Sequence, residues 1–293
     1  MRPALNLTPA TDTKRVDAFT LRRSDHVRAP VIFASPHSGT LYPDRMVEQL
    51  SVPLSDVQRT EDAFVDELYT DAIRQGAILL SANYARAYVD LNRDARELDH
   101  DMFEDGLPRT AGMPSARVKA GLGCLPRVGA SGRNIYTDRL SKSEGVHRLE
   151  TVYDRYHGAL QSEIEDLKTD WSDVFIIDCH SMPSRQPGRS SLPDIVLGDR
   201  FGSSCSAPLT SLAERHFRRE GLSVTRNAPY AGGYTTRRYG RPRRGVHVLQ
   251  IEINRGLYMN ELDVEKSAGF TTTQEQVSRL IGQVLDLALN ENG

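Results

Sequence analysis

Two histidines in the sequence stand where an apolar run ends. His37 follows APVIFAS (29 to 35) and the turn-forming Pro36, and His180 follows DVFIIDC (173 to 179). Histidine nitrogens and carboxylate oxygens are the usual ligands of a catalytic zinc ion, which takes three side chains and leaves a position for water. The pair therefore predicts a metal site, although a single turn histidine is also typical of a purely hydrogen-bonding role.

Carboxylates suited to complete or support this site occur in two places. Glu61 and Asp62 follow Thr60 in TEDAFVDELY, and either acid has the chemistry to bind a divalent metal. Acidic residues are also favoured in the first turn of a helix, for which Thr60 is a suitable N-cap, so a structural role is the alternative. Asp178, two residues before His180, is a candidate to orient that histidine.

Asn92 and Arg93 directly follow a third apolar run, ARAYVDL (85 to 91). A guanidinium matches a carboxylate with two parallel hydrogen bonds and the asparagine adds a donor, so the pair is suited to an acidic substrate. The alternative is a surface salt-bridge group of Arg93 with Asp90 and Asp94, which is common in a chain with 37 lysines and arginines.

Glu252 lies inside GVHVLQIEIN, an otherwise apolar run. A carboxylate buried in such a strand is costly unless it is paired, and burial gives it the raised pKa of a general base. A structural pair with Arg255 or another arginine is the alternative. Gly232 and Gly233 in PYAGGY either let the backbone approach a ligand or form a plain hairpin turn, and Arg237 is a further candidate for binding the substrate.

These residues need an α/β scaffold to bring them together. Apolar runs predict strands at residues 29–35, 76–82, 85–91, 173–179, 193–199 and 247–253. Helical spacing is found at 54–75, 143–169, 205–220 and 260–290. Buried strands separated by helices indicate a mainly parallel mixed sheet with helices on both faces. Ligands of such sheets bind at the carboxyl ends of the strands, where the candidate residues are expected.

The chain is expected to form a single α/β hydrolytic domain over residues 1–293. Residues 1–27 are predicted to be an N-terminal extension, and residues 96–137, which are rich in glycine and proline, an active-site loop region.

Composition argues against several classes of partner. A net charge of -2 provides no basic surface for nucleic acid or an anionic membrane, and no run of about 18 apolar residues occurs. Three scattered cysteines fit a reducing cytoplasm, which is the expected location. The GxGxxG, P-loop and GxSxG motifs are absent, so dinucleotide-binding, nucleotide-hydrolysing and serine-hydrolase functions have no support.

Six motifs together resemble the N-formylglutamate amidohydrolase family. In chain order over residues 28–262 they are PHSG, EDAFVDELY, DLNRD, IDCHS, GGY and LQIEINRGLYM. The family is similar to the zinc carboxypeptidase and aspartoacylase group, which implies a phosphorylase/hydrolase-like, zinc-exopeptidase-like fold. The resemblance also implies that a metal-activated water cleaves N-formyl-L-glutamate to formate and L-glutamate, a step of histidine degradation.

The resemblance implies that Zn²⁺, or another divalent metal, is held by His37, Asp62 and His180. It makes Glu252 the general base on the water and gives Asn92 and Arg93 the role of holding a substrate carboxylate, with an arginine stabilising the oxyanion. The zinc carboxypeptidase pattern has a carboxylate three residues after its first histidine, and HSGT has none. Glu61 therefore remains a competitor of Asp62.

Two other functions stay open at this level. One is a zinc hydrolase of another N-acyl amino acid or a peptide, because the shape of the pocket sets specificity. The other is a non-catalytic binding protein on the same fold. The expected partner is a small-molecule N-acyl amino acid, with no nucleic acid and no membrane, and the sequence is compatible with a homo-oligomer.

Overall fold

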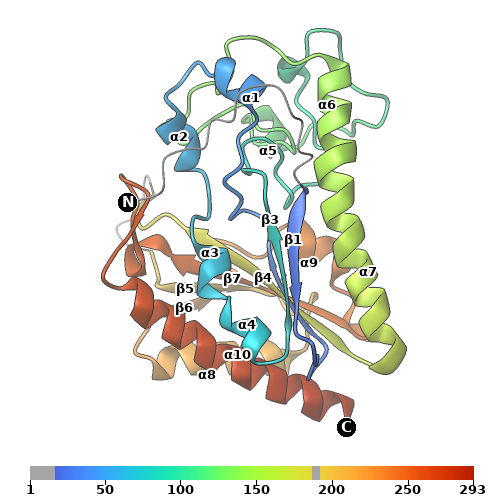
Figure 1. Cartoon of the computed structure of the whole chain (residues 1–293), viewed down its shortest axis with the longest axis vertical. Coiled ribbons are helices and arrows are strands. Elements are labelled where there is room, and N and C mark those ends of the chain that lie inside the picture. Colours follow the sequence, from blue (N-terminus) through green and yellow to red (C-terminus); the bar gives the residue numbers. More distant parts are fainter. Residues whose placement is uncertain (1–16, 187–191) are drawn as a thin grey trace.

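A mixed β-sheet forms the centre of the molecule (Figure 1). The computed structural model describes residues 17–186 and 192–293. In these residues the sheet has the order β1-β3-β2-β4-β7-β5-β6. The strands are β1 (Phe19–Arg23), β2 (Val31–Ser35), β3 (Ile78–Ala82), β4 (Val174–Met182), β5 (Ile195–Gly198), β6 (Val224–Arg226) and β7 (Val246–Asn254). Only β1 against β3 and β5 against β7 are antiparallel among them. The predicted α/β class with a mainly parallel sheet is confirmed.

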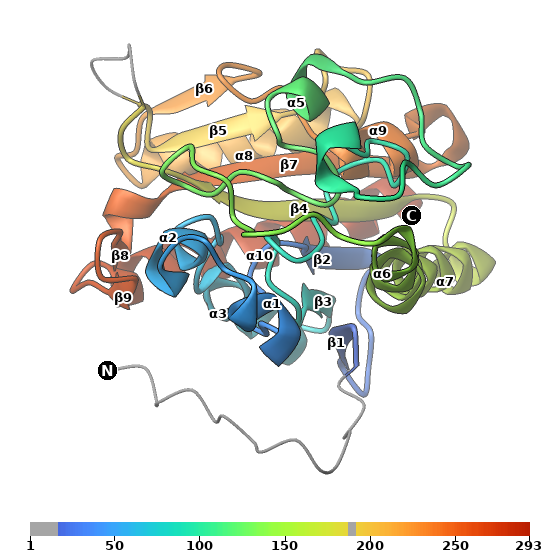
Figure 2. The same ribbon diagram turned by 90° about the horizontal axis from the view of Figure 1, so that it is seen from above.

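Helices cover both faces of the sheet (Figures 1 and 2). One face is covered by α3 (Val65–Leu68), α4 (Asp71–Arg74), α8 (Ala207–Arg219) and α10 (Phe270–Asn292). The other is covered by α7 (Asp154–Asp170) and α9 (Tyr234–Tyr239). A π-helical segment at Leu149–Tyr153 joins α7 to α6 (Lys142–Arg148), which extends beyond the sheet (Figure 1). Strand alternation produces the two cores: Ile32 of β2 packs with the α7 side, whereas its neighbour Phe33 packs with the α10 side.

Two predicted elements are wrong, and both lie beside the candidate site. Residues 85–91 form turns in place of a strand, although most of their side chains are buried. The helix predicted over residues 54–75 is divided into α2 (Leu54–Gln58), α3 and α4. Phe64 has a φ of 65°, which no helix accommodates, and Thr60 donates its hydroxyl hydrogen back to Val57 O at 2.6 Å, so Thr60 does not cap a helix.

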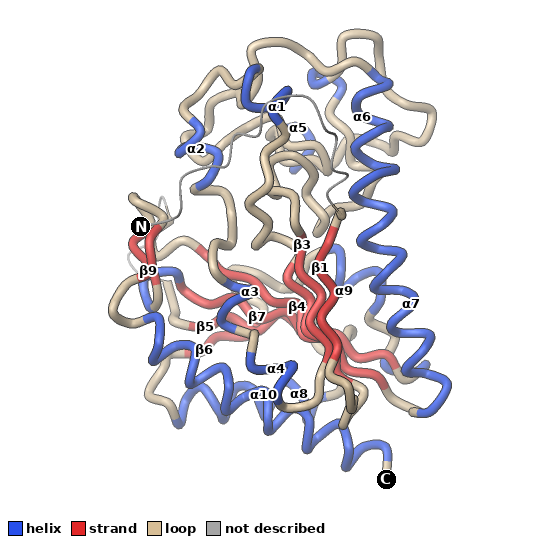
Figure 3. The backbone as a smooth tube through the Cα atoms, viewed as in Figure 1, coloured by secondary structure: helices blue, strands red, loops and turns tan. Residues whose placement is uncertain are grey.

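The segment at residues 96–137 contains little regular structure (Figure 3). Within it lie a 3₁₀-helix (His100–Met102) and α5 (Ala116–Lys119). It lies beside α1 (Asp44–Glu48) and α2 at the loop-rich end of the molecule (Figures 1 and 3).

Both ends of the chain differ in detail from the predicted elements. Of the predicted extension, residues 19–23 form the edge strand β1 and residues 1–16 lie outside the described part. The helix predicted from residue 260 begins at Phe270, after a small hairpin of β8 (Met259–Asn260) and β9 (Glu265–Lys266). No helix in the described residues has the length and apolar character needed to cross a membrane.

Candidate active site

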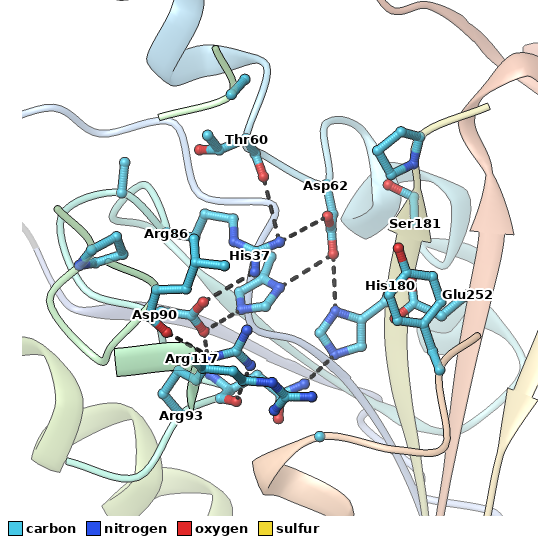
Figure 4. A pocket seen from close by; sticks show the side chains of 18 of the residues that line it. His37, Thr60, Asp62, Arg86, Asp90, Arg93, Arg117, His180, Ser181 and Glu252 are labelled. Atoms are coloured by element: carbon cyan, nitrogen blue, oxygen red, sulfur yellow. Dashed lines mark hydrogen bonds and ion pairs between the residues drawn. The ribbon is translucent and has the colours of Figure 1, made fainter. Parts of the chain in front are cut away.

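The carboxyl ends of the central strands bring the candidate residues together (Figure 4). His37 follows β2 by two residues, and His180 lies near the end of β4. Glu252 of β7 is in register with His180 on the neighbouring parallel strand, so both side chains project from the same face. Cys179 points to the opposite face and is fully buried in the apolar core, as strand alternation predicts.

Asp62 lies between the two histidines. Its Oδ2 atom is 3.3 Å from His37 Nδ1 and 2.9 Å from His180 Nδ1. One ligand atom from each residue lies within 4.8 Å of the other two, and all three residues are buried. Bonds of 2.0–2.2 Å in a tetrahedral zinc site separate ligand atoms by about 3.3 Å, so this donor set fits a zinc-sized divalent cation. Glu61 instead accepts a hydrogen bond from the Tyr42 hydroxyl.

Asp90 supports His37 from the side away from Asp62. His37 Nε2 lies 2.7 Å from Asp90 Oδ1, which directs the other ring nitrogen, Nδ1, toward the centre of the site. Arg86 joins the two carboxylates, with Nη2 donating to Asp90 at 3.0 Å and Nη1 to Asp62 at 3.4 Å. The predicted alternative of a surface group made by Asp90 with Arg93 is wrong, because Asp90 is only 3% exposed and pairs with His37 and Arg86.

Arg255 also contacts Asp62, the acid that lies between the two histidines. Its Nη2 donates to Asp62 Oδ1 at 3.0 Å and its Nε donates to the Ser181 hydroxyl at 3.1 Å. The alternative pairing of Glu252 with Arg255 is therefore wrong. Glu252 accepts a hydrogen bond from Gln250 Nε2 at 2.8 Å, two residues earlier on the same face of β7.

The Asn92 side chain contacts His180. Asn92 Nδ2 lies 2.9 Å from His180 Nε2, and Asn92 Oδ1 accepts hydrogen bonds from the Thr235 backbone N–H at 2.8 Å and its hydroxyl at 3.1 Å. Asp178 Oδ1 lies 3.1 Å from the same His180 nitrogen, as expected for an orienting partner. Asn92 lines the pocket, but its amide is occupied by protein groups, which suits it to positioning His180.

The two glycines of PYAGGY lead into α9 and do not form a hairpin turn. Gly232 has a φ of 116°, a conformation that favours glycine. A Cβ atom at Gly233 would lie 2.3 Å from Asn92 Nδ2 and 2.6 Å from Asn92 Oδ1. The close approach at Gly233 is therefore to the asparagine that contacts His180.

We expect Gly233→Ala to lower the free energy of unfolding by about 1–3 kcal/mol, the usual cost of overpacking a closed site. The matched control is Gly158→Ala, an exposed position within α7 where a new Cβ meets nothing within 4 Å. That control should gain about 0.5–1 kcal/mol from helix propensity. Urea denaturation measures both, and a Gly233→Ala variant as stable as the parent would contradict the described packing.

Burial and charge set the protonation of the site. Burial raises the pKa of Glu252 to about 7, with the charges of Asp62 and Asp178 adding to the effect against His180 and Arg86. Burial opposes ionisation of Asp62, but hydrogen bonds from His180 and His37 hold its pKa well below the usual range. Burial also opposes protonation of His180, yet the charge and hydrogen bond of Asp178 hold its pKa well above the usual value.

The charges around the histidines favour an additional cation. Four buried carboxylates surround them: Asp62, Asp90, Asp178 and Glu252. The arginines paired with these acids are Arg86 and Arg255. A divalent metal would balance the remaining negative charge, in agreement with the geometry of the ligand atoms.

A cavity of about 640 Å³ opens above these residues. The loop region contributes one wall through Arg117, Leu122, Pro126, Val128, Gly129 and Ala130. Arg93 lines the cavity, as do Gly232 and Gly233, whereas Arg237 does not line it and pairs with Asp94 at 3.3 Å. Sequence reasoning missed the roles of Arg86 and Asp90, although Asp90 stands only two residues before Asn92, whose backbone N–H donates to Asp90 Oδ1 at 2.9 Å.

Comparisons with known proteins identify the family of this chain. Residues 29–259 match the family model described as N-formylglutamate amidohydrolase. The chain is 31% identical over 244 residues to the N-formylglutamate deformylase of Pseudomonas aeruginosa, covering 80% of this chain and 84% of that protein. The corresponding protein of Pseudomonas putida is 30% identical over 241 residues, with the same coverage.

A solved structure gives the same result for the fold. The N-formylglutamate amidohydrolase from Ralstonia eutropha JMP134 superposes with a TM-score of 0.88 at 33% identity, covering 94% of this chain and 100% of that chain. The family model, which matches residues 29–259, spans β2, β4 and β7, the strands at whose carboxyl ends His37, His180 and Glu252 lie. The chain belongs to the N-formylglutamate amidohydrolase family.

Proposed function

We propose that this protein is a metal-dependent enzyme that hydrolyses N-formyl-L-glutamate to formate and L-glutamate. The observation that carries the proposal is the convergence of His37, Asp62 and His180 on one point, with Glu252 in register on the adjacent strand. Relatives named for this deformylation, at about a third identity over most of the chain, support the choice of substrate. The metal is Zn²⁺ or another divalent ion of similar preference.

When bound, the metal polarises the formyl carbonyl and makes water a nucleophile near neutral pH. Glu252 accepts the proton of the attacking water as the oxygen bonds to the formyl carbon. It then delivers that proton to the amide nitrogen as the C–N bond breaks, which releases formate and the amino group of glutamate. Burial suits Glu252 to both transfers, because a pKa of about 7 lets it accept and donate at neutral pH.

The surrounding residues hold these groups in place. Gln250 accepts a hydrogen bond from the Gly233 N–H at 2.7 Å and donates to Glu252, which fixes the carboxylate relative to the GGY segment. Asp90 and Asn92 orient the two histidines from outside. Arg93, which lines the pocket, is proposed to bind a carboxylate of the substrate.

The proposal is tested on the purified full-length chain by measuring bound metal and formate release together. We expect about one divalent ion per chain. Activity on N-formyl-L-glutamate should be lost on dialysis against a chelator and restored by added Zn²⁺ or the native metal. Turnover that persists after complete metal removal would overturn the metal requirement. Bound metal with turnover only of other N-acyl amino acids would overturn the substrate.

A further inference from the structure

Five arginines line the cavity, and they differ in how their charge is balanced. Three have carboxylate partners: Arg59 pairs with Asp56 at 2.9 Å, and Arg86 and Arg255 pair with Asp62. The other two are Arg93 and Arg117. Among the residues that the structure describes, no carboxylate oxygen lies within ion-pair distance of either guanidinium.

Arg93 is held without being neutralised. Its Nε donates to Leu122 O at 3.2 Å and its Nη1 donates to Asn92 O at 3.0 Å. Both acceptors are uncharged backbone carbonyls, which orient the guanidinium. The charge of Arg93 helps to lower the pKa of the nearby Asp90, but in the described residues no acid forms an ion pair with Arg93. Within the described residues its Nη2 has no hydrogen-bond partner. The Arg93 guanidinium is therefore held in a fixed orientation, and its Nη2 group is available to bind an anion.

Arg117 lies next to Arg93 but comes from the loop wall. It belongs to α5, and the two arginines lie beside Asp90, with the two histidines between them and Glu252 (Figure 4). Burial lowers the pKa of Arg117, and the charge of Arg93 lowers it further, which shows that the two like charges act on each other. The charges of Glu97 and Asp90 act on Arg117 in the opposite sense, but from beyond ion-pair distance, and an anion bound between or beside the two arginines would relieve their mutual repulsion.

From this we infer that Arg117 recognises the distal side-chain carboxylate of the substrate, while Arg93 takes the carboxylate next to the scissile amide. Two cavity arginines without an ion-pair partner in the described residues match the two carboxylates of a dicarboxylic amino acid. Arg93 directly follows Asn92, which contacts His180, so it lies closer to the reacting carbonyl, whereas Arg117 reaches in from the exposed loop. The inference rests on the proposed function and makes Arg117 the residue that selects acidic side chains.

The test compares N-formyl-L-glutamate with N-formyl-L-glutamine, which has the same shape and a neutral side-chain end. In the parent enzyme kcat/KM should favour the glutamate substrate by about 10- to 100-fold, the range of one charged hydrogen-bonded contact. Arg117→Gln should remove most of that preference by lowering kcat/KM for the glutamate substrate alone. Arg93→Gln should lower kcat/KM for both substrates alike.

Lys119→Gln is the matched control, because it removes one positive charge from the same short helix at an exposed position outside the cavity lining. It should change neither substrate's kcat/KM by more than about twofold, since a screened surface charge contributes little. An Arg117→Gln variant that keeps the parent's preference, or loses activity equally on both substrates, would overturn the inference.

Binding of the free amino acids separates this inference from the proposed function. Calorimetry with L-glutamate and L-glutamine needs no turnover, so it remains informative if neither formyl substrate is hydrolysed. The parent should bind L-glutamate more tightly than L-glutamine, and Arg117→Gln should bind the two alike. Equal binding of both amino acids by the parent would refute the role of Arg117 whatever the outcome for hydrolysis.

Discussion

Glu252→Gln should lower kcat for N-formyl-L-glutamate by about 10²- to 10⁴-fold, the usual contribution of a positioned general base. Glutamine has nearly the same shape as glutamate, and its side-chain carbonyl oxygen can accept the hydrogen bond that Gln250 Nε2 donates to Glu252. The proposed metal ligands His37, Asp62 and His180 are untouched, so metal content should equal that of the parent. Stopped assays of formate release, with metal analysis of the same samples, measure both quantities.

The control for this variant is Glu163→Gln. Glu163 is also a buried glutamate, 6% exposed, but it belongs to α7 and lies outside the cavity lining. Its replacement should leave kcat within about twofold of the parent value, because Glu163 lies away from the cavity and contacts neither the substrate nor the proposed catalytic residues. Glu252→Gln activity within tenfold of the parent would show that another group accepts the proton.

Glu252 is also expected to set the acidic side of the pH dependence of kcat/KM. A base acts only when deprotonated, so kcat/KM should rise with pH and level off above the pKa, which burial raises to about 7. A bound divalent cation favours the carboxylate and moves this rise to lower pH. In Glu252→Gln the residual activity should lose the part of the rise that belongs to Glu252, as a pH series would show.

The two histidines of the proposed metal site were predictable from sequence because their signal is local. An apolar run followed by a histidine marks a strand end in an α/β sheet, and His37 and His180 both lie there. Glu252 was equally visible, since a carboxylate inside an apolar strand needs a reason. The structure adds that β4 and β7 are neighbours in register, which a sequence pattern does not reveal.

Asp62, the proposed acidic ligand, was harder to predict because its segment has a helical pattern. The pattern of TEDAFVDELY predicts a helix that starts near Thr60, but α3 begins only at Val65. The irregular stretch allows the Asp62 N–H to donate to His37 O at 3.0 Å and its carboxylate to reach both histidines. Tertiary contacts of this kind override helix propensity, which is weak by comparison.

The arginines show what remained beyond the sequence. Arg255 and Asp62 form an ion pair although they are 193 residues apart in the sequence, and the sequence around either residue contains no pattern that indicates this pairing. Arg117 is one of many basic residues in a loop region, and it becomes distinctive only when the partners of the other cavity arginines are known. The pairing of charges is a property of the assembled site. Composition alone could therefore not identify the two cavity arginines, Arg93 and Arg117, that have no ion-pair partner in the described residues.

The second large effect is expected for His180→Gln, which removes one of the proposed nitrogen ligands of the metal. Metal affinity should fall by more than about 100-fold, beyond the 10- to 100-fold typical of losing an outer partner. Hydrolysis of N-formyl-L-glutamate should fall by about 10³-fold or more, because the metal supplies several kcal/mol of transition-state stabilisation. Titration with Zn²⁺ in the presence of a competing chelator measures the affinity, and formate release measures the activity.

His247→Gln is the matched control for this variant. His247 is a buried histidine on β7, next to β4, and its Nε2 lies 2.8 Å from Asp173 Oδ1, so its replacement removes a similar polar contact. It stands at the opposite end of the strand from Glu252 and does not line the cavity. Both variants should lose some stability, but only His180→Gln should lose metal. Stoichiometric, tightly held metal in His180→Gln would refute the ligand set, because two remaining side chains do not hold a catalytic zinc ion at that strength.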